Sequence, residues 1–290
     1  MNHPVITEML QAYACTNEQQ AANALREIMQ SVALFALSRQ DFFSRAAFYG
    51  GTALRILYGL NRGSEDMDFT LLAPDPKFEL GSYAGGIETV FASFGLDVSF
   101  AEKVKLRRTD IRSAFLKGNT KAQLLSIGLD STLARRIHAR NELKIKIEVD
   151  VQPPRGFATE IKYLYRPQPF AIRACALPDL LAGKLHAVLF RSWGSRVKGR
   201  DWYDLAWYAG THPEYNLLHL ENRARQSGDW SGPSSLTDDA VHAMLESKLS
   251  RTDLEAAGDD VRPFLRDSND LACWNRDFFL DVFRRLHAAK

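Results

Sequence analysis

Residues 48–69 read FYGGTALRILYGLNRGSEDMDF, and this stretch decides the predicted fold. Its first part is a turn, Gly50-Gly51-Thr52, which follows an apolar segment. The two glycines permit a turn that β-carbons would obstruct, and we expect Thr52 to cap a helix over residues 53–58 that stops at Gly59. Because free N–H groups at the start of a helix attract anions, the turn predicts a phosphate-binding site.

The second part of the stretch is an Asp-x-Asp pair, and thirteen residues separate it from Thr52. Alternation along a predicted strand over residues 66–72 places Asp66 and Asp68 on the same face. Their α-carbons would lie about 6–7 Å apart, so the carboxylates can share Mg²⁺ ions about 3.5–4 Å apart, an arrangement for in-line displacement at phosphorus. Either motif alone is common in turns and solvated strand edges. The two together, in this order, favour a catalytic site.

A two-metal site needs a third carboxylate, and a second predicted strand supplies two candidates. Residues 144–151 alternate between polar side chains and isoleucine or valine, so Glu148 and Asp150 share a face with Lys144 and Lys146. Either carboxylate can complete the set, and the pattern does not choose between them. The alternative is that both pair with the lysines on a solvated face.

Further candidates lie on predicted helices. Lys184 and Arg191 are seven residues apart in a helical pattern over residues 178–191, so both fall on nearly the same face and can grip a departing triphosphate. Asp201 stands at the start of the next helix, where it either caps that helix or orients Lys184 or Arg191.

The remaining patterns predict an α/β (α+β) chain with two domains. We expect a mixed-sheet domain with N-terminal helices over residues 1–170 and a helical domain over residues 171–290. The expected helices and strands before the boundary are a helix over 19–39, a helix over 84–94, strands over 97–104, 111–117 and 121–128, and a strand pair within 158–174. After it we expect helices over 178–191, 201–209, 238–248, 259–265 and 270–286.

Composition describes an ordinary globular chain, with 46% hydrophobic and 25% charged residues. Three scattered cysteines, Cys15, Cys175 and Cys273, favour neither a disulfide framework nor a zinc site. The N-terminus does not resemble a signal peptide, and no apolar run approaches about 20 residues. We therefore expect a cytoplasmic protein with no membrane partner.

Charge is uneven along the chain although the net charge is only +2. Residues 101–150 carry twelve Lys or Arg against six Asp or Glu, whereas residues 221–260 carry four against nine. The basic side chains suit a polyanion-binding surface. The alternative is that they lie on strand faces exposed to solvent. They are Lys103, Lys105, Arg107, Arg108, Arg112, Lys117, Lys121, Arg135, Arg136, Arg140, Lys144 and Lys146.

The chain resembles the AbiEii/AbiGii-type nucleotidyltransferase toxins, including their MenT-like members, of the polymerase-β-like nucleotidyltransferase superfamily. The likeness extends over about residues 45–210. The first motif is shared across the superfamily, and its combination with the later blocks is more specific. The blocks that carry the resemblance are residues 50–54, 62–69, 146–149, 184–191 and 198–205.

The resemblance implies transfer of a nucleoside monophosphate from a nucleoside triphosphate, with two Mg²⁺ ions and release of pyrophosphate. In studied relatives the acceptor is the 3′ end of tRNA, and an AbiEi-like antitoxin is encoded nearby. When the family's roles are assigned to the matching positions of this sequence, the implied catalytic residues are Asp66, Asp68, Glu148, Asp150, Lys184 and Asp201. Of these, Asp66, Asp68 and Glu148 are expected to hold metal. The nucleotide-binding residues are Gly50, Gly51, Thr52, Ser64, Lys184 and Arg191. Asp150 departs from the commoner pattern, so the choice of third carboxylate stays open.

Two other interpretations stay open. In one, the same chemistry acts on a small molecule, such as an antibiotic, or on a protein hydroxyl. In the other, the chain is a relative without catalytic activity that only binds RNA or a partner.

Overall fold

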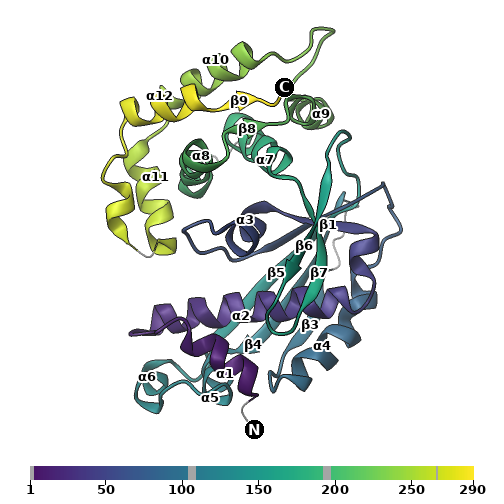
Figure 1. Ribbon diagram of the computed structural model, residues 1–290, viewed down its shortest axis with the longest axis vertical. Helices are drawn as coiled ribbons and strands as arrows, with labels where there is room; N and C mark the ends of the chain where they lie inside the picture. The colour runs from purple at the N-terminus through teal and green to yellow at the C-terminus, as the bar shows by residue number, and fades with distance from the viewer. Residues whose placement is uncertain (1–2, 104–108, 192–196, 266) are drawn as a thin grey trace. The chain divides into compact units, whose positions relative to one another are not determined.

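A computed structural model describes residues 3–103, 109–191, 197–265 and 267–290 (Figure 1). None of the helices in these ranges is long and apolar enough to cross a membrane. The chain divides into two compact units. The first comprises Met1–Ala53, Ser64–Pro153 and Ile161–Ala174, and the second comprises Leu54–Gly63, Pro154–Glu160 and Cys175–Lys290.

The predicted boundary at residues 170–171 lies close to the last of these divisions, after Ala174. Two earlier segments, Leu54–Gly63 and Pro154–Glu160, also belong to the second unit. Helix α3 (Gly50–Tyr58) therefore begins in the first unit and ends in the second.

A seven-stranded mixed sheet forms the centre of the first unit, as predicted for the fold class. Its spatial order is β3-β4-β5-β2-β1-β7-β6. Strand β2 is parallel to β5 and β1 is parallel to β7, whereas the pairs β1–β2, β4–β5 and β3–β4 are antiparallel. The strands are β1 (Ala46–Tyr49), β2 (Met67–Leu71), β3 (Ser99–Glu102), β4 (Ile111–Asn119), β5 (Glu142–Asp150), β6 (Thr159–Leu164) and β7 (Phe170–Cys175).

One face of this sheet is apolar and carries helices. Helix α2 (Glu18–Ser38), drawn in purple, runs across the strands in Figure 1 and packs on β5 and on α4 (Ala84–Ser93). Ile145, Ile147 and Val149 of β5 are fully buried. Burying each such side chain contributes about 1.5–3 kcal/mol, so this face anchors the sheet. The polar residues that alternate with them lie on the opposite face.

Shorter elements complete the first unit, and one of them corrects a prediction. The predicted strand over 121–128 is wrong, because α5 (Thr120–Ser126) is a helix capped by Asn119, whose Oδ1 accepts from the Ala122 N–H at 2.9 Å. Its buried residues Thr120, Gln123 and Leu124 follow helical spacing. The other elements are α1 (Pro4–Gln11), the 3₁₀ turns η1 (Phe42–Ser44) and η2 (Leu80–Tyr83), and α6 (Ser131–Arg136).

The second unit is mainly helical. The predicted helices over 178–191, 201–209 and 238–248 are confirmed as α7 (Leu177–Phe190), α8 (Gly199–Thr211) and α10 (Asp238–Leu249). The sequence patterns missed α9 (Leu217–Ser227) and a small parallel pair, β8 (Glu214–Tyr215) with β9 (His287–Ala288).

The bounds of the last two helices differ from the prediction because the capping residues stand elsewhere. Asp253 caps α11 (Leu254–Val261), and a 3₁₀ turn η3 (Arg262–Phe264) with Pro263 follows it. After η4 (Ser268–Leu271), Asn275 caps α12 (Arg276–Arg285).

Candidate active site

The turn between β1 and α3 brings glycine against a carboxylate. Gly50 has φ +83°, a left-handed conformation that side chains disfavour, and a Cβ built there would lie 2.5 Å from Oδ2 of Asp68. Two independent reasons therefore require glycine at this position. Since α3 already begins at Gly50, Thr52 lies within its first turn and is not the predicted N-cap.

The side chain of Thr52 has a different contact from the one we expected. It is fully buried, its Oγ1 donates to the backbone carbonyl of Asp66, and it lies 2.8 Å from Oγ of Ser64. The hydroxyl thus ties the helix to the loop that precedes β2. A phosphate-binding role for Thr52 stays a prediction and would rest on its backbone N–H.

A buried glutamine on α2 holds the same loop from another side. Nε2 of Gln30 donates to the carbonyls of Ser64 at 3.1 Å and Glu65 at 3.2 Å, and the residue is 1% exposed. Sequence reasoning missed this residue. The available signal was a polar side chain among Ile28, Met29 and the other buried positions of this helix.

Strand register brings Asp68 beside Glu148. Strand β2 begins at Met67, directly after Asp66, and Asp68 lies opposite Tyr49 of β1 and opposite Glu148 of β5. Residues opposite each other on neighbouring strands project to the same face, so the Asp68 and Glu148 side chains adjoin.

Asp150 lies two residues further along β5. It is opposite Thr70, and its Oδ1 accepts from the Gln152 N–H at 2.9 Å. The register therefore separates the two candidates for the third carboxylate, because only Glu148 adjoins Asp68.

Glu148 already has two partners. Its Oε1 accepts from Oγ of buried Ser113 at 3.1 Å and lies 2.8 Å from Nζ of Lys146. The Lys146 and Glu148 side chains are 34% and 24% exposed, and ion pairs with this access to solvent contribute little, typically about 0–1 kcal/mol. The contact with Lys146 can therefore be exchanged for another cation at small cost.

The donor chemistry of these strands fits a hard divalent cation. Asp66, Asp68 and Glu148 offer carboxylate oxygens, which are the ligands that Mg²⁺ prefers. Within the described residues no three His, Cys, Asp or Glu side chains are already grouped as a metal site.

A separate network of charges lies within the second unit. Arg62 makes two hydrogen bonds of 2.7 Å to the Asp204 carboxylate, and Nζ of Lys184 lies 2.7 Å from Asp204 Oδ2 and 3.0 Å from Asp201 Oδ1. Asp204 is fully buried and Arg62 is 2% exposed. Two cations and two carboxylates therefore neutralise each other, with Arg62 and Asp204 out of contact with water and the Lys184 and Asp201 side chains 14% and 13% exposed.

The pKa shifts in this network follow from burial and pairing. Burial alone would lower the pKa of Lys184 and of Arg62, but the carboxylate of Asp204 offsets it and both values are raised. Burial alone would raise the pKa of Asp201, but contact with Lys184 offsets it and the value is lowered. All three groups are charged at neutral pH.

The network contains residues outside the predicted set. Arg62 lies within residues 48–69, and Asp204 follows Asp201 by three residues. The sequence therefore showed both as charged residues but gave no partner for either. Arg191 follows α7 as its C-cap residue and is exposed. The nucleotide roles of Lys184, Arg191 and Asp201 stay predictions.

Two solved structures resemble this chain. JHP933 from Helicobacter pylori is 18% identical with a TM-score of 0.52, over 93% of this chain and 91% of that one. A candidate nucleotidyltransferase from H. pylori is also 18% identical, with a TM-score of 0.49 over 89% of each chain. The likeness to JHP933 shows a shared fold. No match was found among curated proteins.

The chain is a nucleotidyltransferase by its family match, and its mixed sheet carries a glycine turn against the carboxylate of Asp68. The chain belongs to the AbiEii family, described as nucleotidyl transferase AbiEii toxin of type IV toxin–antitoxin systems, which matches residues 32–282. It is therefore a nucleotidyltransferase toxin with a nucleoside triphosphate as substrate, in a system that includes an antitoxin.

Proposed function

We propose that this chain transfers a nucleoside monophosphate from a nucleoside triphosphate to the 3′-hydroxyl of tRNA, with Mg²⁺ as cofactor. The observation that carries the proposal is the register of Asp68 against Glu148, together with the contact between Asp68 and the Gly50 turn. Asp66, Asp68 and Glu148 would hold two Mg²⁺ ions, which supply charge neutralisation at the reacting phosphate.

Glu148, and not Asp150, is our choice for the third carboxylate. It adjoins Asp68, whereas Asp150 lies opposite Thr70 and accepts a backbone hydrogen bond. Glu148 would accept the proton of the tRNA 3′-hydroxyl as that oxygen bonds to the α-phosphorus. The bond from the α-phosphorus to the bridging oxygen breaks, and pyrophosphate leaves with the electron pair.

The first turn of α3 would bind the triphosphate. Gly50 and Gly51 stand at the start of a nine-residue helix, where the first backbone N–H groups have no partner within the helix and the dipole favours an anion. Thr52 adds its N–H, since its hydroxyl is committed to the loop before β2. Ser64, 2.8 Å from that hydroxyl, would complete the phosphate contacts.

Lys184 and Arg191 would neutralise the pyrophosphate as it leaves. The raised pKa of Lys184, which its carboxylate partners cause against the effect of burial, supports a permanent positive charge on this residue. Asp201 would orient the ammonium, which it contacts at 3.0 Å.

The excess of twelve basic over six acidic residues in 101–150 favours a polyanionic acceptor such as tRNA. A cationic small molecule is the second candidate acceptor, since residues 221–260 carry four basic against nine acidic residues. On the tRNA proposal the enzyme acts in the cytoplasm, and an AbiEi-like protein is the antitoxin.

The test is incubation of the purified chain with each α-labelled nucleoside triphosphate, Mg²⁺ and purified tRNA. Parallel reactions contain total protein or small metabolites. We expect label on tRNA, none after chelation of the metal, and none with Asp68→Asn. Label on metabolites or protein alone would reject tRNA as the acceptor, and full labelling by Asp68→Asn would reject the site.

A further inference from the structure

The polar face of the sheet, opposite the face that α2 covers, carries a row of lysines next to Glu148. Lys144 and Lys146 alternate with the buried isoleucines of β5, and Lys117 of β4 lies directly opposite Lys144. Like charges directly opposite each other on neighbouring strands destabilise a sheet. The pair therefore has a cost in the free protein that a bound anion would remove.

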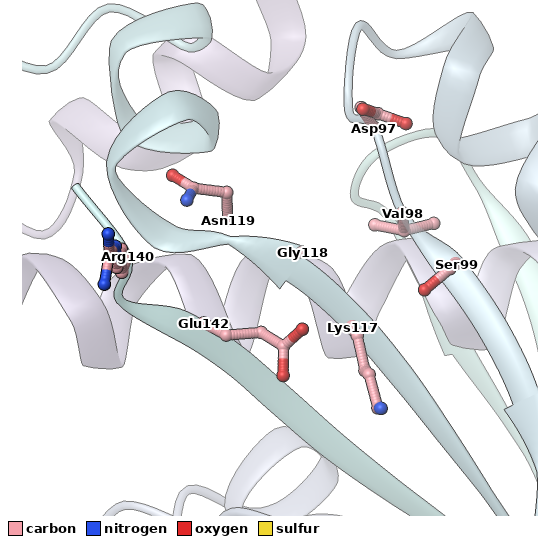
Figure 2. A pocket seen from close by; sticks show the side chains of 8 residues that line it. All are labelled: Asp97, Val98, Ser99, Lys117, Gly118, Asn119, Arg140 and Glu142. Atoms are coloured by element: carbon pink, nitrogen blue, oxygen red, sulfur yellow. The ribbon is translucent and has the colours of Figure 1, made fainter.

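The row leads to a polar hollow at one end of these strands. The hollow has a volume of about 320 Å³, and Figure 2 shows the side chains around it. Its polar lining comes from Asp97, Ser99, Lys117, Asn119, Arg140 and Glu142. Lys117 and Glu142 lie on β4 and β5, and Arg140 precedes β5.

Several cations at this end are not neutralised by the protein. In the part of the chain that the structure describes, the side chains of Lys117 and Arg140 have no hydrogen-bond or ion-pair partner. Arg135 and Arg136, at the end of α6, form no ion pair there either, and both are exposed.

Most acidic groups at this end are already engaged. Glu142 pairs with Lys144 at 3.2 Å, and the Asp130 carboxylate caps α6 through the N–H groups of Thr132 and Leu133. Asp97 is the remaining carboxylate of the hollow. Cations without partners therefore outnumber it, which suits a ligand with several negative charges.

We propose that the phosphate backbone of the RNA acceptor lies along this face, from Glu148 past Lys146 and Lys144 to Lys117 and Arg140. The inference rests on the proposed function. Six residues of a strand at about 3.3 Å each separate Glu148 from Glu142, so the row is about 20 Å long and spans several nucleotides. The contacts are to phosphates, so they position the RNA without reading its sequence. Lys105, Arg107 and Arg108 lie outside the described residues and are not part of the proposal.

The test is a triple variant, Lys117→Gln, Lys144→Gln and Arg140→Gln, which leaves Lys146 and Glu148 intact. A matched triple, Arg39→Gln, Lys77→Gln and Lys290→Gln, removes equal charge from exposed positions outside the strands. Binding of fluorescent tRNA is measured by anisotropy without nucleotide over a series of salt concentrations. Calorimetry of Mg²⁺–nucleotide binding and thermal melting are measured on the same samples.

We expect roughly tenfold or greater weakening of tRNA binding in the first triple and a salt slope smaller by about two, since each phosphate contact contributes about 0.7–0.9 to that slope. The matched triple should bind tRNA within about twofold of wild type, since its changes leave the proposed contacts intact. Nucleotide binding should be unchanged in both. Lys117→Gln alone should raise the melting temperature, because it removes the opposed like charge.

Unchanged tRNA affinity and salt slope in the first triple, or no tRNA binding by wild type, would overturn the docking surface. If the first triple melts early, Arg140→Glu at an exposed position provides the same test. Normal labelling of tRNA by the first triple would reject the surface and leave the proposed function intact. Conversely, a wild type that binds RNA through this face but labels another acceptor would reject the proposed function and RNA as the acceptor, while leaving the face as an RNA-binding surface.

Discussion

Gly50 faces the carboxylate of Asp68 so closely that a methyl group on Gly50 would lie 2.5 Å from Asp68 Oδ2. The contact joins the two halves of the opening motif, which are separated in sequence and adjacent in the sheet because β1 pairs with β2. Gly50, which the left-handed turn requires, thus also leaves the space that the Asp68 carboxylate occupies.

Gly50→Ala should abolish most nucleotide transfer, with a loss of about 100-fold or more, since displacements near 1 Å at a reacting group have effects of that size. Gly59→Ala is the matched control. Gly59 has a similar φ of +75°, but no atom lies within 4 Å of the Cβ built there. The control should lose about 1–2 kcal/mol of stability from backbone strain and keep its activity. Equal loss of activity in both variants would mean that strain, and not contact with Asp68, is responsible.

Glu148→Gln should lower kcat for transfer by about 10²- to 10⁴-fold, the range for loss of a general base, with intact folding. Asp150→Asn should stay within a few-fold of wild type, because its carboxylate is opposite Thr70 and accepts from the Gln152 N–H. The rate of tRNA labelling and the melting temperature are measured for both variants and compared with those of wild type. The reverse pattern would assign the third carboxylate to Asp150.

Asp204→Ala should destabilise the protein by about 3–5 kcal/mol, because it leaves Arg62 and Lys184 buried with one fewer partner. Urea unfolding provides the measurement. Asp201→Ala should cost less, because Lys184 then keeps its contact with Asp204. The double variant Arg62→Leu with Asp204→Leu should recover part of the loss, since replacing both partners leaves no unpaired charge. A change below about 1 kcal/mol in Asp204→Ala would contradict the role of the network.

His219 should make stability depend on pH in weakly acidic solution. The residue is 4% exposed, and its burial and the nearby Arg223 lower its pKa to about 4 from the usual 6.5. Between these values the unfolded chain binds a proton that the folded chain does not, so stability is lost as pH falls below 6.5. The free energy of unfolding should fall by about 1 kcal/mol from this group between pH 7 and 5.5.

His219→Gln should remove that part of the pH dependence, and urea unfolding at pH 7 and pH 5.5 compares it with wild type. His186, whose pKa burial and Arg223 also lower to about 4, supplies a similar dependence in both proteins. Identical pH dependence in wild type and variant would show that His219 takes up its proton without unfolding.

Local patterns were enough for the strands and helices with strong periodicity. The alternation of β5 and the long apolar stripe of α2 follow from side-chain spacing alone, and the Gly-Gly-Thr and Asp-x-Asp motifs marked the carboxylate strand. The same reasoning failed at residues 121–128, where the Asn119 cap, helical spacing and good helix formers such as Ala122 and Leu124 produce a helix. Short elements are the least reliable because few residues specify their period.

The amino-acid sequence by itself determined which residue types are available: two glycines that permit a left-handed turn, and carboxylates at alternating positions on strands. Tertiary structure decided their neighbours. Only the pairing of β2 with β5 puts Glu148 beside Asp68, and only the packing of α2 brings Gln30 onto the loop before Asp66. Spacing along one strand sets which face a side chain occupies, whereas strand order and register depend on contacts between residues far apart in the chain.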